Sequence, residues 1–177
     1  MVVLGFPALD VVAQATAAGQ ATFPYVPGLL AFRELPTVLA ACEQLGSRPD
    51  LILCDAHGIA HPRRFGIASH LGYCLDVASV GCARRRLVGE HEPVAAPRGS
   101  RAWLTDAGAR VGAAVRTRAG VKPTFVSPGF AVSLADAVDV VLATTRWYRM
   151  PEPIRQAQLL AKEKKRRTSV ASSLTVS

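Results

Sequence analysis

The sequence predicts an α/β fold in which helices cover both faces of a buried sheet. Half of the 177 residues are hydrophobic, which is enough for one domain with a substantial core. The run "LILC" at 51–54 is apolar without alternation, as is typical of a strand covered on both faces. Helix-like and strand-like segments alternate along the chain, as such a sheet requires. We expect one domain over residues 1–162 and a basic, disordered tail over residues 163–177.

The first half of the domain is expected to contain two strands and one helix. "VVLGF" opens the chain as a strand. "ATFPYVPGLLAFRE" (21–34) should be extended, because its prolines fix φ and bias the residues before them away from helix. A helix is predicted from Pro36, which suits a first turn, to Gly46, which ends it. The strand 51–54 follows and leads into the polar loop "DAHGIAHPRR".

The second half continues the alternation. "RFGIASHLGYCLD" (64–76) has the pattern of a helix and "VASVGCAR" (77–84) that of a strand. A loop is expected over 90–101, and residues 110–128 indicate two strands joined by a turn near Gly120. Ser133 caps a further helix, and a last helix begins near Glu152. The buried stripe of the Ser133 helix consists of Leu134, Ala137, Val138, Val141 and Leu142.

The charge balance makes a polyanion, nucleic acid first of all, a partner to test. Lysine and arginine number 21 against 13 acidic residues, for a net charge of +8. The alternative is an ordinary solvated basic surface, since part of the charge lies in the tail "KEKKRR". The first residues lack a basic region and are interrupted by Pro7 and Asp10, so we expect neither an export signal nor a membrane span.

The four cysteines occur singly and predict free thiols. None forms a Cys-x-x-Cys pair, and no histidine lies at zinc-finger spacing. Buried thiols of this kind fit a reducing cytoplasm. The cysteines are Cys42, Cys54, Cys74 and Cys82.

Acidic and imidazole side chains gather where the central strand ends. Asp55 follows "LILC" directly, and functional crevices of α/β sheets lie beyond the carboxyl ends of strands. Asp55 can hold a divalent cation there, or it can simply turn the chain. Glu34 is a second carboxylate that could reach the same crevice, and Mg²⁺ is held beside phosphates by one or two carboxylates. A zinc site at His57 and His61 would need further ligands, for which only His70 and His91 remain.

Basic and aromatic residues near this loop suit phosphates and bases. Arg63, Arg64 and the "RRR" run at 84–86 can contact phosphates, or they can form a solvated basic edge. Tyr25 lies between prolines in "FPYVPG", which would present its ring at low entropic cost for insertion into a base stack. The alternative is a rigid turn with a packed tyrosine.

Five segments together resemble the signature blocks of the endonuclease V family. They are "FPYVPGLLAFRELP", "PDLILCDAHGIAHPRRFGIASHLG", "SVGCARRRLVGE", "VKPTFVSPGF" and "PEPIRQA". The resemblance implies a ribonuclease H-like fold, with a mixed sheet flanked by helices. It implies a repair endonuclease that cuts the second phosphodiester bond 3′ to deoxyinosine, using Mg²⁺ or Mn²⁺ and leaving a 5′-phosphate and a 3′-hydroxyl. Inosine-containing RNA is a further partner to test, and we expect a cytoplasmic monomer.

The resemblance also assigns roles to residues of this chain. Asp55 matches the metal-binding aspartate, Glu34 the catalytic glutamate that also faces the metal, and His61 a histidine near the scissile phosphate. Arg84 falls where the family has a lysine that contacts the nucleic acid backbone, and Gly81 would line the pocket for the extruded base. The wedge that enters the duplex matches Pro24, Tyr25, Val26 and Pro27.

Several positions depart from the family pattern. The family's first metal-binding aspartate lies on a strand upstream of "VVLGF", so the resemblance implies an N-terminally truncated fold without that ligand. Ala56, Phe130 and Gln158 stand where the pattern has glycine, histidine, and aspartate or histidine. Two hypotheses therefore stand beside each other. The chain is a nuclease whose start is misassigned or truncated, or it is a degenerate relative that binds nucleic acid without cutting it. A third, unrelated phosphate-binding α/β protein requires the resemblance to be accidental.

Overall fold

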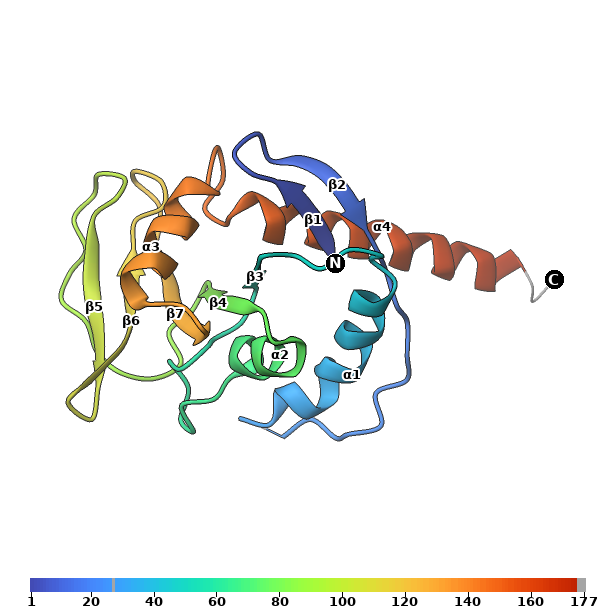
Figure 1. Ribbon diagram of the computed structural model, residues 1–177, viewed down its shortest axis with the longest axis horizontal. Coiled ribbons are helices and arrows are strands. Elements are labelled where there is room, and N and C mark those ends of the chain that lie inside the picture. Colours follow the sequence, from blue (N-terminus) through green and yellow to red (C-terminus); the bar gives the residue numbers. More distant parts are fainter. Residues whose placement is uncertain (27, 175–177) are drawn as a thin grey trace.

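A five-stranded mixed sheet with helices on both faces forms the centre of the protein (Figure 1). The structure, a computed structural model, describes residues 1–26 and 28–174. The strands of the central sheet are β3 (Leu51–Cys54), β4 (Ala78–Ala83), β5 (Arg101–Asp106), β6 (Ala109–Val115) and β7 (Thr124–Phe130). A separate hairpin consists of β1 (Val2–Gly5) and β2 (Asp10–Gln14). The helices are α1 (Leu30–Glu43), α2 (Ile67–Leu75), α3 (Leu134–Ala143) and α4 (Glu152–Leu174).

The sheet order is β3-β4-β7-β6-β5, and only its first pair is parallel. Leu51 lies opposite Ala78, and Cys54 lies opposite Gly81. Because parallel strands end at the same edge of a sheet, the segments that leave β3 and β4 begin side by side. The remaining pairs, β4 with β7, β7 with β6 and β6 with β5, are antiparallel. The topology therefore places the ends of β3 and β4 at one common edge.

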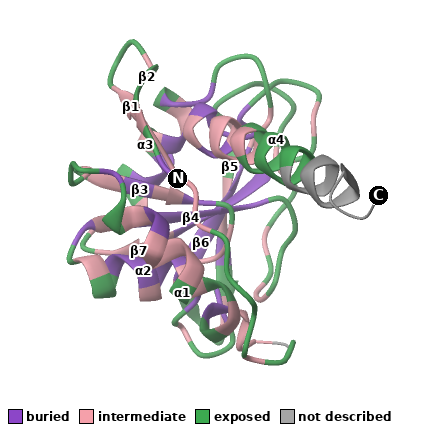
Figure 2. Cartoon of the chain, turned by 90° about the vertical axis from the view of Figure 1, so that its right-hand side faces the viewer, coloured by how far each residue is buried: buried purple, intermediate pink, exposed green. Residues whose placement is uncertain are grey.

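Two hydrophobic clusters lie on opposite faces of this sheet, as a doubly covered sheet requires. On one face α3 and α4 pack against β4, β6 and β7, with Val80, Val126 and Val138 fully buried. On the other face α1 and α2 pack against β3, where Ile52 and Leu71 are buried. Figure 2 shows the buried residues concentrated on the strands and on the inward faces of the helices. The predicted α/β class is therefore confirmed.

Helix α1 begins earlier than the sequence pattern predicts. It starts at Leu30, so Pro36 lies inside the helix instead of in its first turn. The extended segment ends sooner because Gly28, with φ of +77°, turns the chain ahead of it. Leucine, alanine, arginine and glutamate then favour helix strongly enough to tolerate one proline. The expectation that 21–34 is extended throughout was wrong, and Glu34 belongs to a helix.

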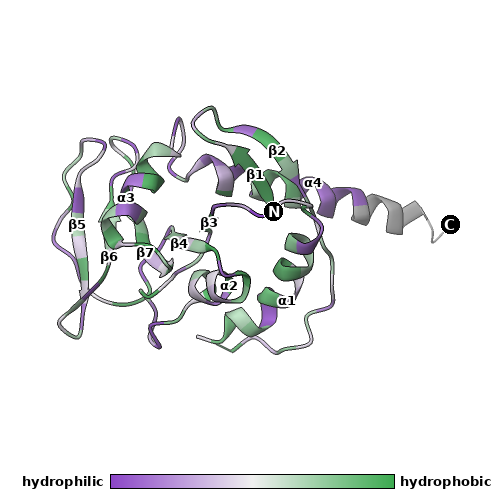
Figure 3. Cartoon of the chain, in the orientation of Figure 1, coloured by the Kyte–Doolittle hydropathy of each residue, from purple (hydrophilic) through white to green (hydrophobic). Residues whose placement is uncertain are grey.

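The C-terminal segment also differs from expectation. Helix α4 runs to Leu174, so residues 163–174 are helical where a disordered tail was predicted. Lysine, glutamate and arginine have high helix propensity, and Arg167 pairs with Glu163 one turn earlier at 2.6 Å. Figure 1 shows this part of α4 extending away from the sheet, and its residues 163–167 are hydrophilic (Figure 3). The end of the predicted tail, residues 175–177, lies outside the described residues.

Other predicted elements were confirmed with small shifts of their ends. The strands at β1, β3, β4, β6 and β7 occur as expected, and the Oγ atom of Ser133 accepts a hydrogen bond from the backbone N–H of Asp136. Strands β2 and β5 were missed. Cys54 and Cys82 are buried as expected, whereas Cys74 is exposed; all four cysteines are free thiols. Within the described residues, no helix is both long and apolar enough to cross a membrane.

Candidate active site

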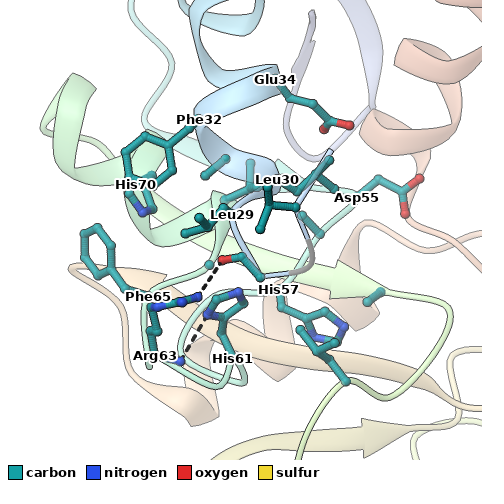
Figure 4. Close-up of a pocket in the computed structure, with 18 of the residues that line it drawn as sticks. Leu29, Leu30, Phe32, Glu34, Asp55, His57, His61, Arg63, Phe65 and His70 are labelled. Atoms are coloured by element: carbon teal, nitrogen blue, oxygen red, sulfur yellow. Dashed lines mark hydrogen bonds between the residues drawn. The ribbon is translucent and has the colours of Figure 1, made fainter. Parts of the chain in front are cut away.

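A pocket of about 760 Å³ opens at the edge where β3 and β4 end. Its walls come from the segment before α1, from α1 itself, from the loop between β3 and α2, and from the residues after β4. Figure 4 shows the carboxylates of Glu34 and Asp55 at one end of this pocket and the rings of Phe32, Phe65 and His70 at the other. The sheet topology and the start of α1 thus join two acidic residues that are far apart in sequence.

Asp55 is the first residue after β3, and its carboxylate has two partners. Arg84, the first residue after β4, donates from Nη1 to Oδ2 at 3.1 Å. Gln158 of α4 donates to the same oxygen from Nε2. The side chains of Asp55 and Arg84 are 39% and 45% exposed, so water screens their ion pair. The sequence prediction that Asp55 lies in a crevice is met, but its contact with Arg84 and Gln158 was not predicted.

Glu34 lies on α1 and faces the pocket together with Asp55. Burial raises the pKa of Glu34, the neighbouring Arg33 lowers it, and the charge of Asp55 raises it further. The last contribution means that the two carboxylates repel one another across the pocket. A cation placed between them would relieve this repulsion.

The two carboxylates can be compared with what a divalent cation requires. The described residues hold no cluster of three or more histidine, cysteine, aspartate or glutamate side chains that could bind a metal. Mg²⁺, however, commonly binds through one or two carboxylates and keeps several waters. Glu34 and Asp55 supply hard oxygen donors of this kind at an open pocket. The donor set therefore fits a largely hydrated Mg²⁺ or Mn²⁺.

His61 is arranged as a neutral hydrogen-bond donor. It is 8% exposed, and burial lowers its pKa, as do the nearby Arg63 and His70. Its Nδ1 atom accepts the backbone N–H of Arg63 at 3.3 Å. A neutral ring that accepts at Nδ1 carries its proton on Nε2. His61 can therefore donate from Nε2 to an oxygen in the pocket.

Both arginines of the "PRR" stretch have partners within the protein. Arg63 donates from Nη1 to the backbone oxygen of Gly28 at 3.1 Å, which ties the segment before α1 to this loop. Arg64 forms an ion pair with Asp106 of β5 at 2.7 Å. Arg63 is exposed, as are the arginines at 84–86, so phosphate contacts by either group stay a prediction.

Tyr25 is presented to solvent on an anchored segment. It is 70% exposed, and its neighbour Val26 is also partly exposed. Arg33 donates to the backbone oxygen of Phe23 at 2.9 Å, so the segment is held before the tyrosine as well as after it. Of the predicted wedge, Pro24, Tyr25 and Val26 are described, while Pro27 lies outside the described residues. The exposed ring argues against a tyrosine packed into a rigid turn.

Gly81 lies one layer behind the pocket wall. A Cβ atom on Gly81 would lie 2.4 Å from the backbone nitrogen of Gly58 and 2.6 Å from the oxygen of Ala56. Glycine at this position lets the loop after β3 press against β4, while Ala56 and His57 form the wall. Gly81 itself does not line the pocket, and its role in holding an extruded base stays a prediction.

The aromatic end of the pocket was not predicted from the sequence. The rings of Phe65 and His70 meet at 4.4 Å between centroids, and those of Phe32 and His70 at 5.5 Å. Phe32 comes from α1, whereas the other two belong to the segment that leads into α2 and to α2 itself. No local pattern links these positions. Only the packing of α1 against α2 brings them together.

The half-buried His57 predicts that stability falls in mild acid. Burial lowers the pKa of His57 below its usual 6.5, and a backbone hydrogen bond at Arg85 opposes this only in part. The unfolded chain then binds more protons than the folded one below pH 6.5, so this contribution is present above that pH and is lost as the pH falls through the folded-state pKa. In urea unfolding between pH 7.5 and 5.5, we expect His57→Asn to flatten the fall in stability. Equal slopes for His57→Asn and the parent would contradict the assignment.

Comparison with known proteins gives a consistent result. A model of the endonuclease V family matches residues 1–159. The endonuclease V of Roseiflexus sp. (strain RS-1) is 53% identical over 161 residues, which are 91% of this chain and 72% of that protein. The endonuclease V of Streptomyces avermitilis is 53% identical over 91% of this chain and 70% of its own length.

Solved structures agree with the sequence comparison. The crystal structure of the Streptomyces avermitilis endonuclease V has a TM-score of 0.91 at 50% identity and covers 95% of this chain and 74% of its own. Ciona intestinalis endonuclease V, crystallised with DNA containing an inosine followed by a ribo-adenosine, has a TM-score of 0.79 at 26% identity, over 94% of this chain and 78% of its own. The chain therefore belongs to the endonuclease V family of deoxyribonucleases and shares their ribonuclease H-like fold.

Proposed function

We propose that the chain is a metal-dependent repair endonuclease that hydrolyses the second phosphodiester bond 3′ to deoxyinosine in DNA. The observation that carries this proposal is the carboxylate pair Glu34 and Asp55, at one end of a pocket whose rim presents Tyr25. A family relative crystallised with inosine-containing DNA supports the choice of substrate. The excess of basic residues suits a nucleic acid partner.

The residues of the pocket would divide the work as follows. Asp55 and Glu34 would hold Mg²⁺ or Mn²⁺, which when bound polarises the phosphate and favours formation of hydroxide. His61, with its proton on Nε2, would donate a hydrogen bond to the scissile phosphate and so offset developing charge. Arg84 would contact the nucleic acid backbone, because a guanidinium group can bind a phosphate through two N–H donors.

Recognition would come from the segment before α1 and from the wall after β3. The wedge of Pro24, Tyr25, Val26 and Pro27 would enter the duplex, and the extruded base would lie against the wall that Gly81 supports. Inosine in single-stranded RNA would meet the same wall without the cost of unpairing. Free thiols, including the exposed Cys74, suit a reducing cytoplasm, and we expect the protein to act there as a monomer.

A second candidate function is nucleic acid binding without cleavage. The observation that favours it is the engagement of the Asp55 carboxylate by Arg84 and Gln158. If these partners prevent a cation from binding Asp55, the wedge and the basic residues would still bind a duplex, but the phosphodiester bond would stay intact.

A labelled duplex with a single deoxyinosine separates the two functions. With Mg²⁺ present, we expect a nick that EDTA abolishes, and no nick in a duplex with deoxyguanosine at the same position. Tighter binding of the inosine duplex without a nick would establish the second function in place of the first. Absence of both a nick and binding to either duplex would contradict both.

Replacement of Tyr25 should weaken engagement of the lesion. Stacking of one base on an aromatic side chain contributes about 1–3 kcal/mol, so Tyr25→Ala should raise the Kd for the inosine duplex by about 5- to 150-fold. Fluorescence anisotropy with uncleaved duplex in EDTA measures this directly. Trp147→Ala is the matched control, because Trp147 is also exposed but lies outside the pocket. A Tyr25→Ala variant that binds as well as the control would contradict the wedge.

A further inference from the structure

The Asp55 carboxylate belongs to a closed ring of hydrogen bonds made by three elements. Arg84 donates from Nη1 to Oδ2 of Asp55 at 3.1 Å and from Nη2 to Oε1 of Gln158 at 3.0 Å. Gln158 in turn donates from Nε2 to the same Oδ2 atom. Asp55 follows β3, Arg84 follows β4, and Gln158 lies on α4. Both donors therefore converge on one oxygen of the acid that would bind a metal.

The backbone next to Asp55 and Arg84 makes this ring a built feature. Arg149 donates from Nη2 to the backbone oxygens of Arg84 and Pro123, each at 2.6 Å, which fixes the start of the segment after β4. The parallel register of β3 and β4 sets the two strand ends side by side. The direction of α4 places Gln158 beside Asp55, because the first turns of this helix pack against the sheet at Ile154. The backbone positions of β3, β4 and α4 therefore hold the three side chains of the ring within hydrogen-bonding distance.

We propose that Arg84 and Gln158 compete with a divalent cation for the Asp55 carboxylate, so that the protein alone holds its metal ligand in a closed state. The proposal rests on the proposed function only in taking Asp55 as a metal ligand. The guanidinium supplies the positive charge that otherwise a cation would supply beside the mutually repelling Glu34 and Asp55. Because the two donors occupy the lone pairs of Oδ2, a cation that takes this oxygen must displace at least one of them.

The exposure of these side chains determines how strongly Arg84 and Gln158 compete with a cation. Because Asp55 and Arg84 are 39% and 45% exposed, their ion pair is screened and reversible. Exposed pairs are weak, and removal of Arg84 should therefore raise cation affinity by about 3- to 5-fold, the upper range for such pairs. Removal of Gln158, a neutral donor, should have a smaller effect of about 2-fold.

The competition also gives Arg84 two mutually exclusive partners. In the protein alone it binds Asp55, whereas beside nucleic acid its fork can bind a phosphate. A phosphate that draws Arg84 away frees Oδ2, so nucleic acid would favour entry of the cation. By linkage, the cation would favour release of Arg84 toward the phosphate to the same extent.

Mn²⁺ binding to the full chain without nucleic acid tests the proposal. Electron paramagnetic resonance of free Mn²⁺ gives the Kd of each variant, independent of any cleavage. Arg84→Gln should lower the Kd by about 3- to 5-fold. Arg85→Gln is the matched control, because it removes the same charge one residue along, and the Arg85 guanidinium has no hydrogen bond or ion pair to Asp55 in the described residues. For Gln158→Leu the control is Gln156→Leu on the same helix.

The outcomes separate direct competition from a general effect of charge. A larger gain for Arg84→Gln than for Arg85→Gln, lost again in the Arg84→Gln/Asp55→Asn double variant, supports the proposal. Equal gains for the two arginine variants, or no gain for Arg84→Gln, would overturn it. Arg84→Lys keeps the charge without the fork and should fall between the parent and Arg84→Gln. Thermal melting checks that each variant is folded.

The same titration distinguishes failure of this proposal from failure of the proposed function. Mn²⁺ that binds the parent and all variants alike would overturn the competition and leave the nuclease intact. Mn²⁺ binding that responds to Arg84 as expected, together with absence of any nick in inosine DNA, would uphold the competition and contradict the nuclease. Absence of Mn²⁺ binding in every variant would overturn both.

Discussion

Asp55→Asn should lower the rate of nicking of inosine-containing DNA by about 10²- to 10³-fold, the scale of losing one preorganised electrostatic group. An amide keeps the shape of the side chain but removes its negative charge, which leaves Glu34 as the single carboxylate among the described residues that line the pocket. Binding should change much less, since Tyr25 and the basic residues stay in place. Single-turnover nicking and anisotropy in EDTA measure the two quantities separately.

The control for this experiment lies at the opposite end of the same strand. Asp50 directly precedes β3 and is exposed, so Asp50→Asn removes the same charge without touching the pocket. We expect this variant to nick like the parent. An Asp55→Asn variant that nicked normally would show that Asp55 holds no metal. It would contradict the proposed mechanism even if the control behaved as expected.

Gly58→Ala should destabilise the fold and disable the site together. A Cβ atom at Gly58 would lie 1.9 Å from the backbone oxygen of Pro128 and 2.5 Å from its carbonyl carbon. Because both atoms belong to the backbone of β7, no side chain can rotate to make room. Overpacking of this kind costs about 1–3 kcal/mol, which urea unfolding should register as a lower midpoint.

Gly58→Ala should also lower the rate of nicking. Gly58 also donates its backbone N–H to the Oγ atom of Ser127 at 2.8 Å, so a shift here moves the loop that follows Asp55. A displacement of about 1 Å in a catalytic group can lower a rate by about 100-fold. Gly19→Ala is the control, because its Cβ would meet only the hydroxyl of Thr37, at 3.3 Å. Equal nicking and unfolding midpoints for the two variants would contradict the close packing of this loop.

The core of the site could be predicted because its signals are local. An apolar run followed by an acid marks a strand end, and this placed Asp55 at the edge of the sheet. Glu34 was predicted to reach the same crevice but from an extended segment, whereas it lies on α1. The error arose because two prolines dominated the pattern, although the residues between Gly28 and Pro36 favour helix.

The contacts that tune the site could not be predicted in this way. Gln158 and Asp55 are 103 positions apart, and their hydrogen bond depends on where α4 crosses the sheet. Strand β5 was missed because "RAWLTD" lacks a clear alternation, and its pairing with β6 identifies it instead. Long-range packing, not local pattern, decides such features.

The position of the nick tests the central claim most directly. The protein, with Mg²⁺ and a duplex labelled on both sides of a single deoxyinosine, should give one cut at the second phosphodiester bond on the 3′ side. The products should carry a 3′-hydroxyl and a 5′-phosphate, so that ligase can reseal the nick. An intact duplex, or a cut that falls equally on a duplex with deoxyguanosine, would contradict the account.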